Sequence, residues 1–127
     1  MLGEVPKSKM VTTGGAYDGD TVLLTKGIAI EGTAVLAREI PESLISAGLD
    51  KSIIDRAAQL LFYPGISVVH DAAIAFAVGC VNAMHDPTEG GVSAGLWEMS
   101  DACNMGIKIY QDKIPLLPEC KLICNAL

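Results

Sequence analysis

Two apolar segments on either side of Pro64-Gly65 limit the folds that this chain can adopt. In residues 51–62 the apolar side chains fall at helical spacing along one side, which predicts an amphipathic helix that starts after Asp50. Residues 68–79 are small and apolar nearly all round. A helix of that composition has no side suited to water, so we expect it to be buried in the interior of the domain.

Helical spacing recurs in three other parts of the chain. It predicts helices over residues 32–39 and 90–103 and a short helix after Pro118, with Pro41 ending the first of them. In the helix over 90–103, apolar residues separated by four, three and four positions form a stripe that we expect to face the core. The stripe comprises Val92, Leu96, Met99 and Cys103.

Short apolar or β-branched runs predict the strands of a small sheet. They lie at residues 10–13, 21–25, 81–85 and 106–111. Half of the residues are apolar but only 5% are aromatic, so the core must be aliphatic. We therefore expect an α+β fold (layered α/β) in which a small mixed sheet is packed with helices.

The charge of the chain excludes some classes of partner. The formal net charge is -6, and the basic residues are scattered. Sequence-independent nucleic-acid binding and attachment to an anionic membrane both need clustered Lys and Arg, so we expect neither. We find no secretory signal and no continuous apolar run of the ~18 residues that a membrane span requires.

The four cysteines indicate a reducing compartment rather than a disulfide framework. Cys80, Cys103, Cys120 and Cys124 form no CxxC pair and no zinc spacing with the two histidines. Cys120 and Cys124 would lie one turn apart in a helix and could share a metal, but two small buried residues are the favoured interpretation. We expect no metal site and a cytoplasmic location.

The segment His85-Asp86-Pro87-Thr88-Glu89-Gly90-Gly91 is the one most suited to chemistry. It lies between a predicted strand and a predicted helix, where Thr88 can cap the helix with its hydroxyl. Gly90 and Gly91 leave backbone N–H groups open at the helix start, which favours an anion such as phosphate. Asp86 is a candidate metal ligand or proton-transfer group, and His85 a candidate acid or base.

The same segment also fits a plain turn followed by a helix cap. Glu89 favours that interpretation, because its charge would repel a phosphate unless it were paired. A lone histidine in a strand is usually structural, which applies to His85 as well.

Beyond these local patterns, the chain resembles the aminoimidazole ribonucleotide synthetase superfamily. Residues 83–91 (AMHDPTEGG) resemble the superfamily signature HDxTxGG, and within the superfamily the HypE family of hydrogenase maturation factors is most similar. Residues 14–37 (GGAYDGDTVLLTKGIAIEGTAVLA) resemble its opening strand, glycine loop and helix. Residues 96–115 (LWEMSDACNMGIKIYQDKIP) resemble the helix and strand that follow.

The resemblance implies an ATP-dependent parent enzyme that activates an amide or thiocarboxamide oxygen by phosphoryl transfer. Asp86 and His85 would be its catalytic residues in this region. Thr88, Gly90 and Gly91 would face the nucleotide or the phosphorylated intermediate, and the loop from Gly27 to Thr33 would form the neighbouring wall. The full-length parent would need ATP and Mg²⁺, whereas no cofactor is expected for this chain alone.

The resemblance also predicts the domain organisation. Residues 1–13 would be a connector from an amino-terminal ATP-binding domain, and residues 14–127 the first part of the carboxy-terminal domain. A sheet without its remaining strands would expose an unpaired edge, so we expect self-association or pairing with the rest of the domain. Glu89 and Glu31 depart from the Arg and His frequent in the family, and make this cleft more acidic.

Three hypotheses about function follow from the sequence. In the first, the chain is part of an enzyme of hydrogenase maturation or a related step, acting with other maturation proteins and inactive on its own. In the second, the chain is a truncated, non-catalytic relative that acts as a protein-binding or assembly module. In the third, the chain is a free-standing domain that binds phosphate or nucleotide by itself, which Glu89 and the missing ATP contacts disfavour.

Overall fold

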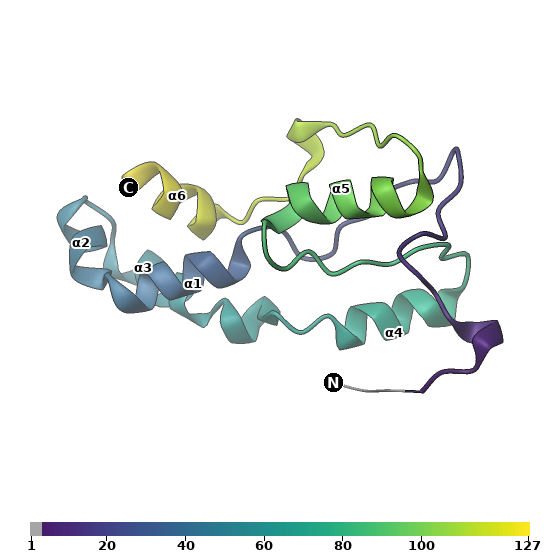
Figure 1. Cartoon of the computed structure of the whole chain (residues 1–127). Helices are drawn as coiled ribbons and strands as arrows, with labels where there is room; N and C mark the ends of the chain where they lie inside the picture. The colour runs from purple at the N-terminus through teal and green to yellow at the C-terminus, as the bar shows by residue number, and fades with distance from the viewer. Residues whose placement is uncertain (1–3) are drawn as a thin grey trace. The chain divides into compact units, whose positions relative to one another are not determined.

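The computed structural model describes residues 4–127, and its regular elements are helices joined by loops (Figure 1). In chain order they are η1 (Lys7–Lys9), α1 (Ile30–Glu39), α2 (Pro41–Ser46), α3 (Lys51–Gln59), η2 (Leu61–Gly65), α4 (Val69–Val78), α5 (Gly91–Cys103), η3 (Gln111–Lys113) and α6 (Pro118–Ala126). They belong to two compact units. The first unit comprises residues 4–22 with Val68–Ile109, and the second comprises Leu23–Ser67 with Tyr110–Leu127.

The hydrophobic core of the described residues lies in the second unit, where α1 packs against α3 and α6. One cluster of buried side chains joins these helices to α2. It contains Ala37, Leu44, Ile54, Ala57 and Ile123. A smaller cluster of Ile30, Ala34 and Leu60 lies at the start of α1. The core is aliphatic, as the composition requires.

Two prolines begin helices in the second unit. Proline at the first helical position has no N–H to leave unpaired, and its fixed φ already suits a helix. Pro118 starts α6 as the sequence predicts. Pro41 was expected to end a helix, and α1 does end before it, but Pro41 is also the first residue of α2, a helix that the sequence analysis missed.

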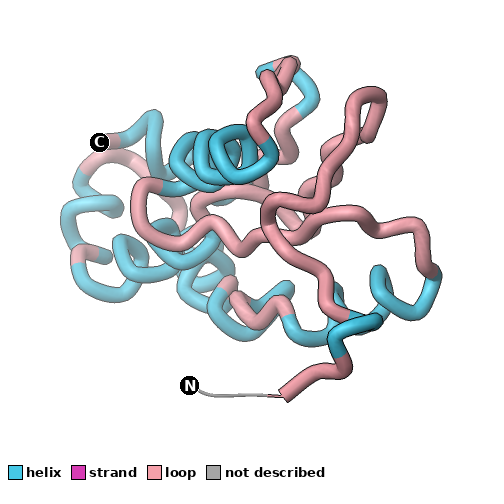
Figure 2. The backbone as a smooth tube through the Cα atoms, turned by 45° about the vertical axis from the view of Figure 1, so that its right-hand side comes forward, coloured by secondary structure: helices cyan, strands magenta, loops and turns pink. Residues whose placement is uncertain are grey.

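The predicted sheet is wrong: the described residues contain no strand, only one isolated parallel bridge between Thr12 and Ala83 (Figure 2). The α+β fold with a small mixed sheet is therefore replaced by a helical one. The physical reason is that a strand exists only when a neighbour pairs with its backbone. The β-branched run at residues 21–25 has no such neighbour here, and Leu23 within it is 85% exposed.

The helix α4 forms almost where it was predicted, but its expected burial is wrong. Across the described chain none of its residues is buried, and Val69 and Val78 are 75% and 79% exposed. The expected core stripe of α5 is likewise only partly buried, at Val92, Leu96, Met99 and Cys103. The first unit thus carries apolar surface that its own described residues do not cover.

The stretch Lys51–Val78 corrects the expectation that no part of the chain is apolar over the length of a membrane span. Within the part of the chain that the structure describes, it is the one stretch long and apolar enough to cross a membrane, with a mean hydropathy of 1.5. It is not one regular helix, because the backbone at Tyr63 is extended (φ -142°, ψ 111°) between α3 and α4. Its α3 part supplies Ile54 and Ala57 to the core. Length and composition alone do not distinguish a membrane span from a core helix.

Candidate functional site

The segment that leads into the candidate site is held beside residues 12–20 of the same unit. Ala83 forms the parallel bridge with Thr12, and the Thr13 hydroxyl donates a hydrogen bond of 3.4 Å to the Met84 carbonyl. At Gly15 the two backbones approach closely, because an added Cβ would lie 2.1 Å from the Asn82 carbonyl oxygen. Only glycine therefore fits at this position.

Asp20 binds the same segment through its carboxylate. Its Oδ2 accepts the Tyr17 backbone N–H at 2.8 Å, and its two carboxylate oxygens accept the Asn82 amide at 2.9 and 3.0 Å. These bonds favour the charged carboxylate, and the Tyr17 N–H, followed by the Asn82 amide, lowers the pKa of Asp20 below its usual value. Asn82, three residues before His85, is thus held at its backbone by Gly15 and at its side chain by Asp20.

The helix start predicted after the motif is confirmed, but its cap is not the one expected. Gly90 is the N-cap residue in left-handed conformation (φ 77°), and Gly91 follows with φ 64°. No side chain caps the helix, so the predicted Thr88 hydroxyl cap is wrong. Thr88 instead accepts the Gly91 N–H with its backbone carbonyl at 3.2 Å. Left-handed φ at the N-cap replaces the extended conformation in which a Ser or Thr side chain could reach the helix amides.

This glycine-built start leaves the approach to the helix open. An added Cβ at Gly91 would meet nothing within 4 Å, and the side chains of Asp86, Thr88 and Glu89 are exposed. The first N–H groups of a helix have no partner inside the helix. Together with the helix dipole, they form a surface that is suited to an anion.

The structure adds one residue to the site that the sequence analysis missed. Glu98, in the middle of α5, places its Oε2 2.5 Å from Nε2 of His85. Neutral histidine has one N–H, so a bond donated by Nε2 leaves Nδ1 as the nitrogen that can accept a proton. No local pattern predicts this pair, because it depends on how the turn packs against α5.

The packing of the turn on α5 depends on a glycine inside the helix. Gly95 is buried, and an added Cβ there would lie 2.9 Å from Cβ of Pro87 and 3.2 Å from Cδ2 of His85. A larger residue would push the turn away from the helix. An isolated glycine within a helical pattern is the one sequence signal that could have predicted this close approach, and the sequence analysis did not use it.

The other two predicted ligand residues, Gly27 and Thr33, belong to the second unit. Gly27 lies against the Pro115 carbonyl, which would be 3.1 Å from an added Cβ, and the next amide, of Ile28, donates to the same oxygen at 3.1 Å. Lys26 anchors the loop further by bonds to the carbonyls of Gly65 and Ser67. Thr33 is only 3% exposed within α1, so this conformation offers its side chain no open surface. Nucleotide contact by Gly27 and Thr33 stays a prediction.

The cysteines and acidic residues of residues 4–127 form no cluster of three groups suited to a metal. Cys120 is buried and Cys124 is exposed one turn later in α6. Burial, followed by the neighbouring Cys120, raises the pKa of the Cys124 thiol. A raised pKa keeps this thiol protonated and a weak nucleophile or ligand.

Comparison with known proteins identifies the family. The family described as AIR synthase related protein, C-terminal domain, matches residues 18–123. A protein of Methanocaldococcus jannaschii named for hydrogenase expression and formation is 30% identical over 127 residues, which cover 99% of this chain and 34% of that protein. The carbamoyl dehydratase HypE of Cupriavidus necator is 30% identical over 128 residues, covering 99% of this chain and 32% of the relative. HypE of Escherichia coli is 29% identical over 109 residues, covering 86% and 29%.

The chain therefore spans about a third of the length of the curated relatives that it matches. No solved structure gives a significant match. The matched range includes the HDPTEGG segment and most of both units. The chain belongs to the AIR synthase related proteins, in the part that corresponds to their carboxy-terminal domain, and it is HypE-like.

Proposed function

We propose that this chain supplies the phosphate-facing turn of an ATP-dependent, HypE-like protein of hydrogenase maturation. The parent protein would transfer a phosphoryl group from ATP to the oxygen of an amide or thiocarboxamide and then release phosphate. The relatives named carbamoyl dehydratase support this choice of reaction. The chain itself would work in the cytoplasm, in keeping with the free cysteines among its described residues.

The observation that carries the proposal is the open, glycine-built start of α5. Gly90 and Gly91 both have positive φ, an added Cβ at Gly91 would meet nothing within 4 Å, and no side chain caps the helix. Amides at a helix start bind phosphate oxygens without any contribution from charged side chains. The exposed Glu89 lies beside this position, so a bound phosphate would need a cation to offset its charge.

Magnesium is the cation that ATP would bring, and one residue of the turn suits it. Mg²⁺ is commonly held by one or two carboxylates together with substrate phosphates, so a cluster of three protein ligands is not required. Asp86 is exposed next to the turn and fits the role of the single carboxylate. The ion would neutralise charge on the phosphate, while the amides at the start of α5 that the Gly91–Thr88 bond leaves open would orient it.

In the same proposal His85 moves a proton and Glu98 positions it. Glu98 accepts from Nε2, which leaves Nδ1 of His85 as the base for a substrate N–H. Side chains that are held by a second hydrogen bond keep one tautomer and one ring orientation. In this proposal the motif needs a histidine at position 85 because one ring nitrogen binds Glu98 and the other takes the substrate proton.

The tautomer of His85 can be measured in the chain alone. We expect ¹⁵N NMR of the imidazole to show Nε2–H as the main neutral form in the wild type and a mixture of tautomers in Glu98→Ala. Glu98→Gln, which retains an acceptor, should stay close to the wild type. With only two histidines in the chain, a His70→Gln variant assigns the signals. An unchanged tautomer ratio in Glu98→Ala would remove Glu98 from the site.

The turn itself is tested by Gly91→Asp. In a full-length HypE-type protein that contains this chain within its carboxy-terminal domain, the new carboxylate would occupy the phosphate position and abolish ATP turnover. Gly48→Asp is the matched control, because Gly48 also has positive φ (91°) and nothing within 4 Å of an added Cβ. Turnover that survives Gly91→Asp, or that is lost equally in both variants, would refute the proposal.

A second function is favoured by the uncovered helix α4. We propose that this apolar helix mediates self-association, because Ile74 and Val78, one turn apart on the same face, are 52% and 79% exposed. A pair of exposed apolar faces that meet removes both from water. Sedimentation velocity should show concentration-dependent dimers that Ile74→Ser and Val78→Ser weaken. A monomer at every concentration would exclude this function for the chain alone.

A further inference from the structure

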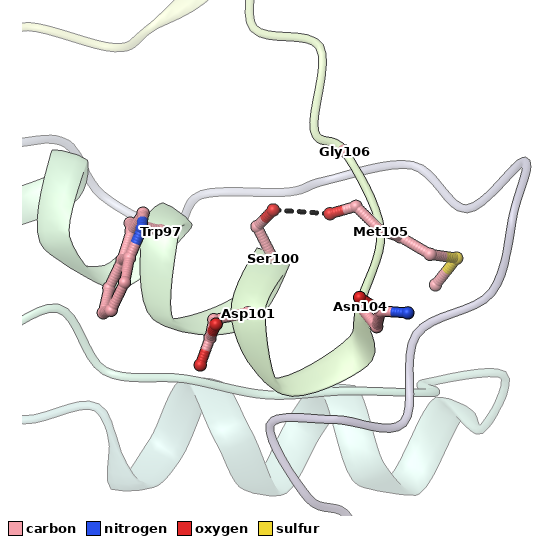
Figure 3. A pocket seen from close by; sticks show the side chains of 6 residues that line it. All are labelled: Trp97, Ser100, Asp101, Asn104, Met105 and Gly106. Carbon is pink, nitrogen blue, oxygen red and sulfur yellow. Dashed lines mark hydrogen bonds between the residues drawn. The ribbon is translucent and has the colours of Figure 1, made fainter.

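A hollow of about 340 Å³ lies at the carboxyl end of α5, away from the turn at the helix start (Figure 3). It is lined by Trp97, Ser100, Asp101, Asn104, Met105 and Gly106. Trp97 is 67% exposed, and its indole and the Asp101 carboxylate lie on the same side of the helix in Figure 3. Their spacing of four residues places them one turn apart on one face.

Hydrogen bonds hold the wall of the hollow in place. Asn104 ends α5 in left-handed conformation (φ 52°), and its N–H donates to the Asp101 carbonyl at 3.1 Å. The Met105 N–H donates to the Ser100 carbonyl at 3.1 Å, while the Ser100 hydroxyl donates to the Met105 carbonyl at 2.5 Å. The chain that leaves the helix is therefore fixed against its last turn.

The hollow carries negative charge from the end of α5 and from Asp101. The carboxyl end of a helix is the negative end of its dipole, and Lys or Arg usually lies there. The last turn of α5 has no basic residue. Within residues 4–127 the Asp101 carboxylate makes no ion pair or hydrogen bond. The face of an indole also attracts cations.

We propose that this hollow binds the guanidinium group of an arginine on the surface of a partner protein. A planar guanidinium can stack on the Trp97 ring while it donates to the Asp101 carboxylate, which a lysine ammonium does less well. The net charge of -6 would attract a basic protein surface over longer range. The site is separate from the turn at Gly90 and Gly91, so it would serve docking rather than phosphoryl transfer.

Trp97 is the one tryptophan of the chain, so its fluorescence reports directly on the hollow. The probe is the blocked peptide acetyl-Gly-Arg-Gly-amide, titrated into the full chain. Acetyl-Gly-Lys-Gly-amide and the neutral citrulline peptide serve as comparisons. We expect a saturable change in emission with the arginine peptide, a weaker one with the lysine peptide and none with the citrulline peptide.

Variants of the two exposed residues test the geometry without disturbing the core. Asp101→Asn should weaken arginine binding by about two- to fivefold, the effect of an exposed ion pair. Asp112→Asn removes the same charge from an exposed position in the second unit and should leave binding unchanged. For Trp97→Leu, binding is followed by the NMR amide signals of Asp101 and Gly106, which should no longer shift. Equal responses to arginine and citrulline, or full binding by Asp101→Asn, would overturn the proposal.

Discussion

Ile123 of α6 allows a direct test of the core of the second unit. Its side chain is 0% exposed and belongs to the cluster that joins α1, α2, α3 and α6. Replacing it by Ala removes three buried carbon atoms, which at about 0.8 kcal/mol each account for about 2.4 kcal/mol. A cavity that does not collapse adds about 24 cal/mol per Å³, so the total loss in unfolding free energy should be about 2.5–5 kcal/mol.

The neighbouring Leu122→Ala variant is a matched control. It removes the same number of carbon atoms from the same helix, but Leu122 is 41% exposed, and Leu and Ala have similar helix propensities. Its effect should be within about 0.5–1 kcal/mol. The two variants therefore differ in burial and in little else.

Urea denaturation followed by circular dichroism measures both variants. With an m-value of about 1.5 kcal/mol/M, a loss of about 3 kcal/mol lowers the midpoint by about 2 M. Ile123→Ala should show this shift with an unchanged m-value. A loss below about 1 kcal/mol, or one equal to that of Leu122→Ala, would show that α6 does not pack in the core as described.

Two further predictions concern packing and charge. Gly95→Ala should destabilise the first unit by about 1–3 kcal/mol, because the new Cβ meets Pro87. Gly32→Ala is the control: it has open space in α1 and should stabilise by about 0.5–1 kcal/mol. Thermal unfolding compares the two variants, and equal effects would contradict the close contact at Gly95. The Arg56 guanidinium, 2.9 Å from Glu119, lowers the pKa of that carboxyl below its usual 4.5. The stability from this pair is therefore present above about pH 4.5 and is lost as the pH falls through the lowered pKa. Urea titrations at several pH values measure this dependence of the unfolding free energy on pH, and Arg56→Gln should remove it. The loss of unfolding free energy should not exceed about 1 kcal/mol, because the Arg56 side chain is 58% exposed. A pH profile that Arg56→Gln leaves unaltered would exclude a contribution from the pair.

The helices were predictable where their signals are local. The apolar spacing of α3, Pro118 at the start of α6 and the glycines at the start of α5 each depend on residues within one or two turns. These signals predicted the positions of the helices to within a few residues. Burial was less predictable, because an apolar helix such as α4 is buried only if another element covers it.

The errors fall where structure depends on distant partners. The run at residues 21–25 has high β propensity, but propensity creates no strand without a neighbouring backbone. The pairing of His85 with Glu98 likewise requires the turn to fold back on α5, which no spacing rule predicts. The HDPTEGG motif was recognised from the sequence, and the family match covers it. Glu98, which holds the histidine of the motif, was not predicted.

The position of Ile123 in the core also has a consequence for the order of events during synthesis. Its partners in the cluster, such as Ala37 and Ile54, leave the ribosome long before it does. Until α6 emerges, the apolar sides of α1 and α3 lack their last covering helix and remain open to solvent or to a chaperone. The second unit can therefore complete its core only after nearly all of these residues have been translated.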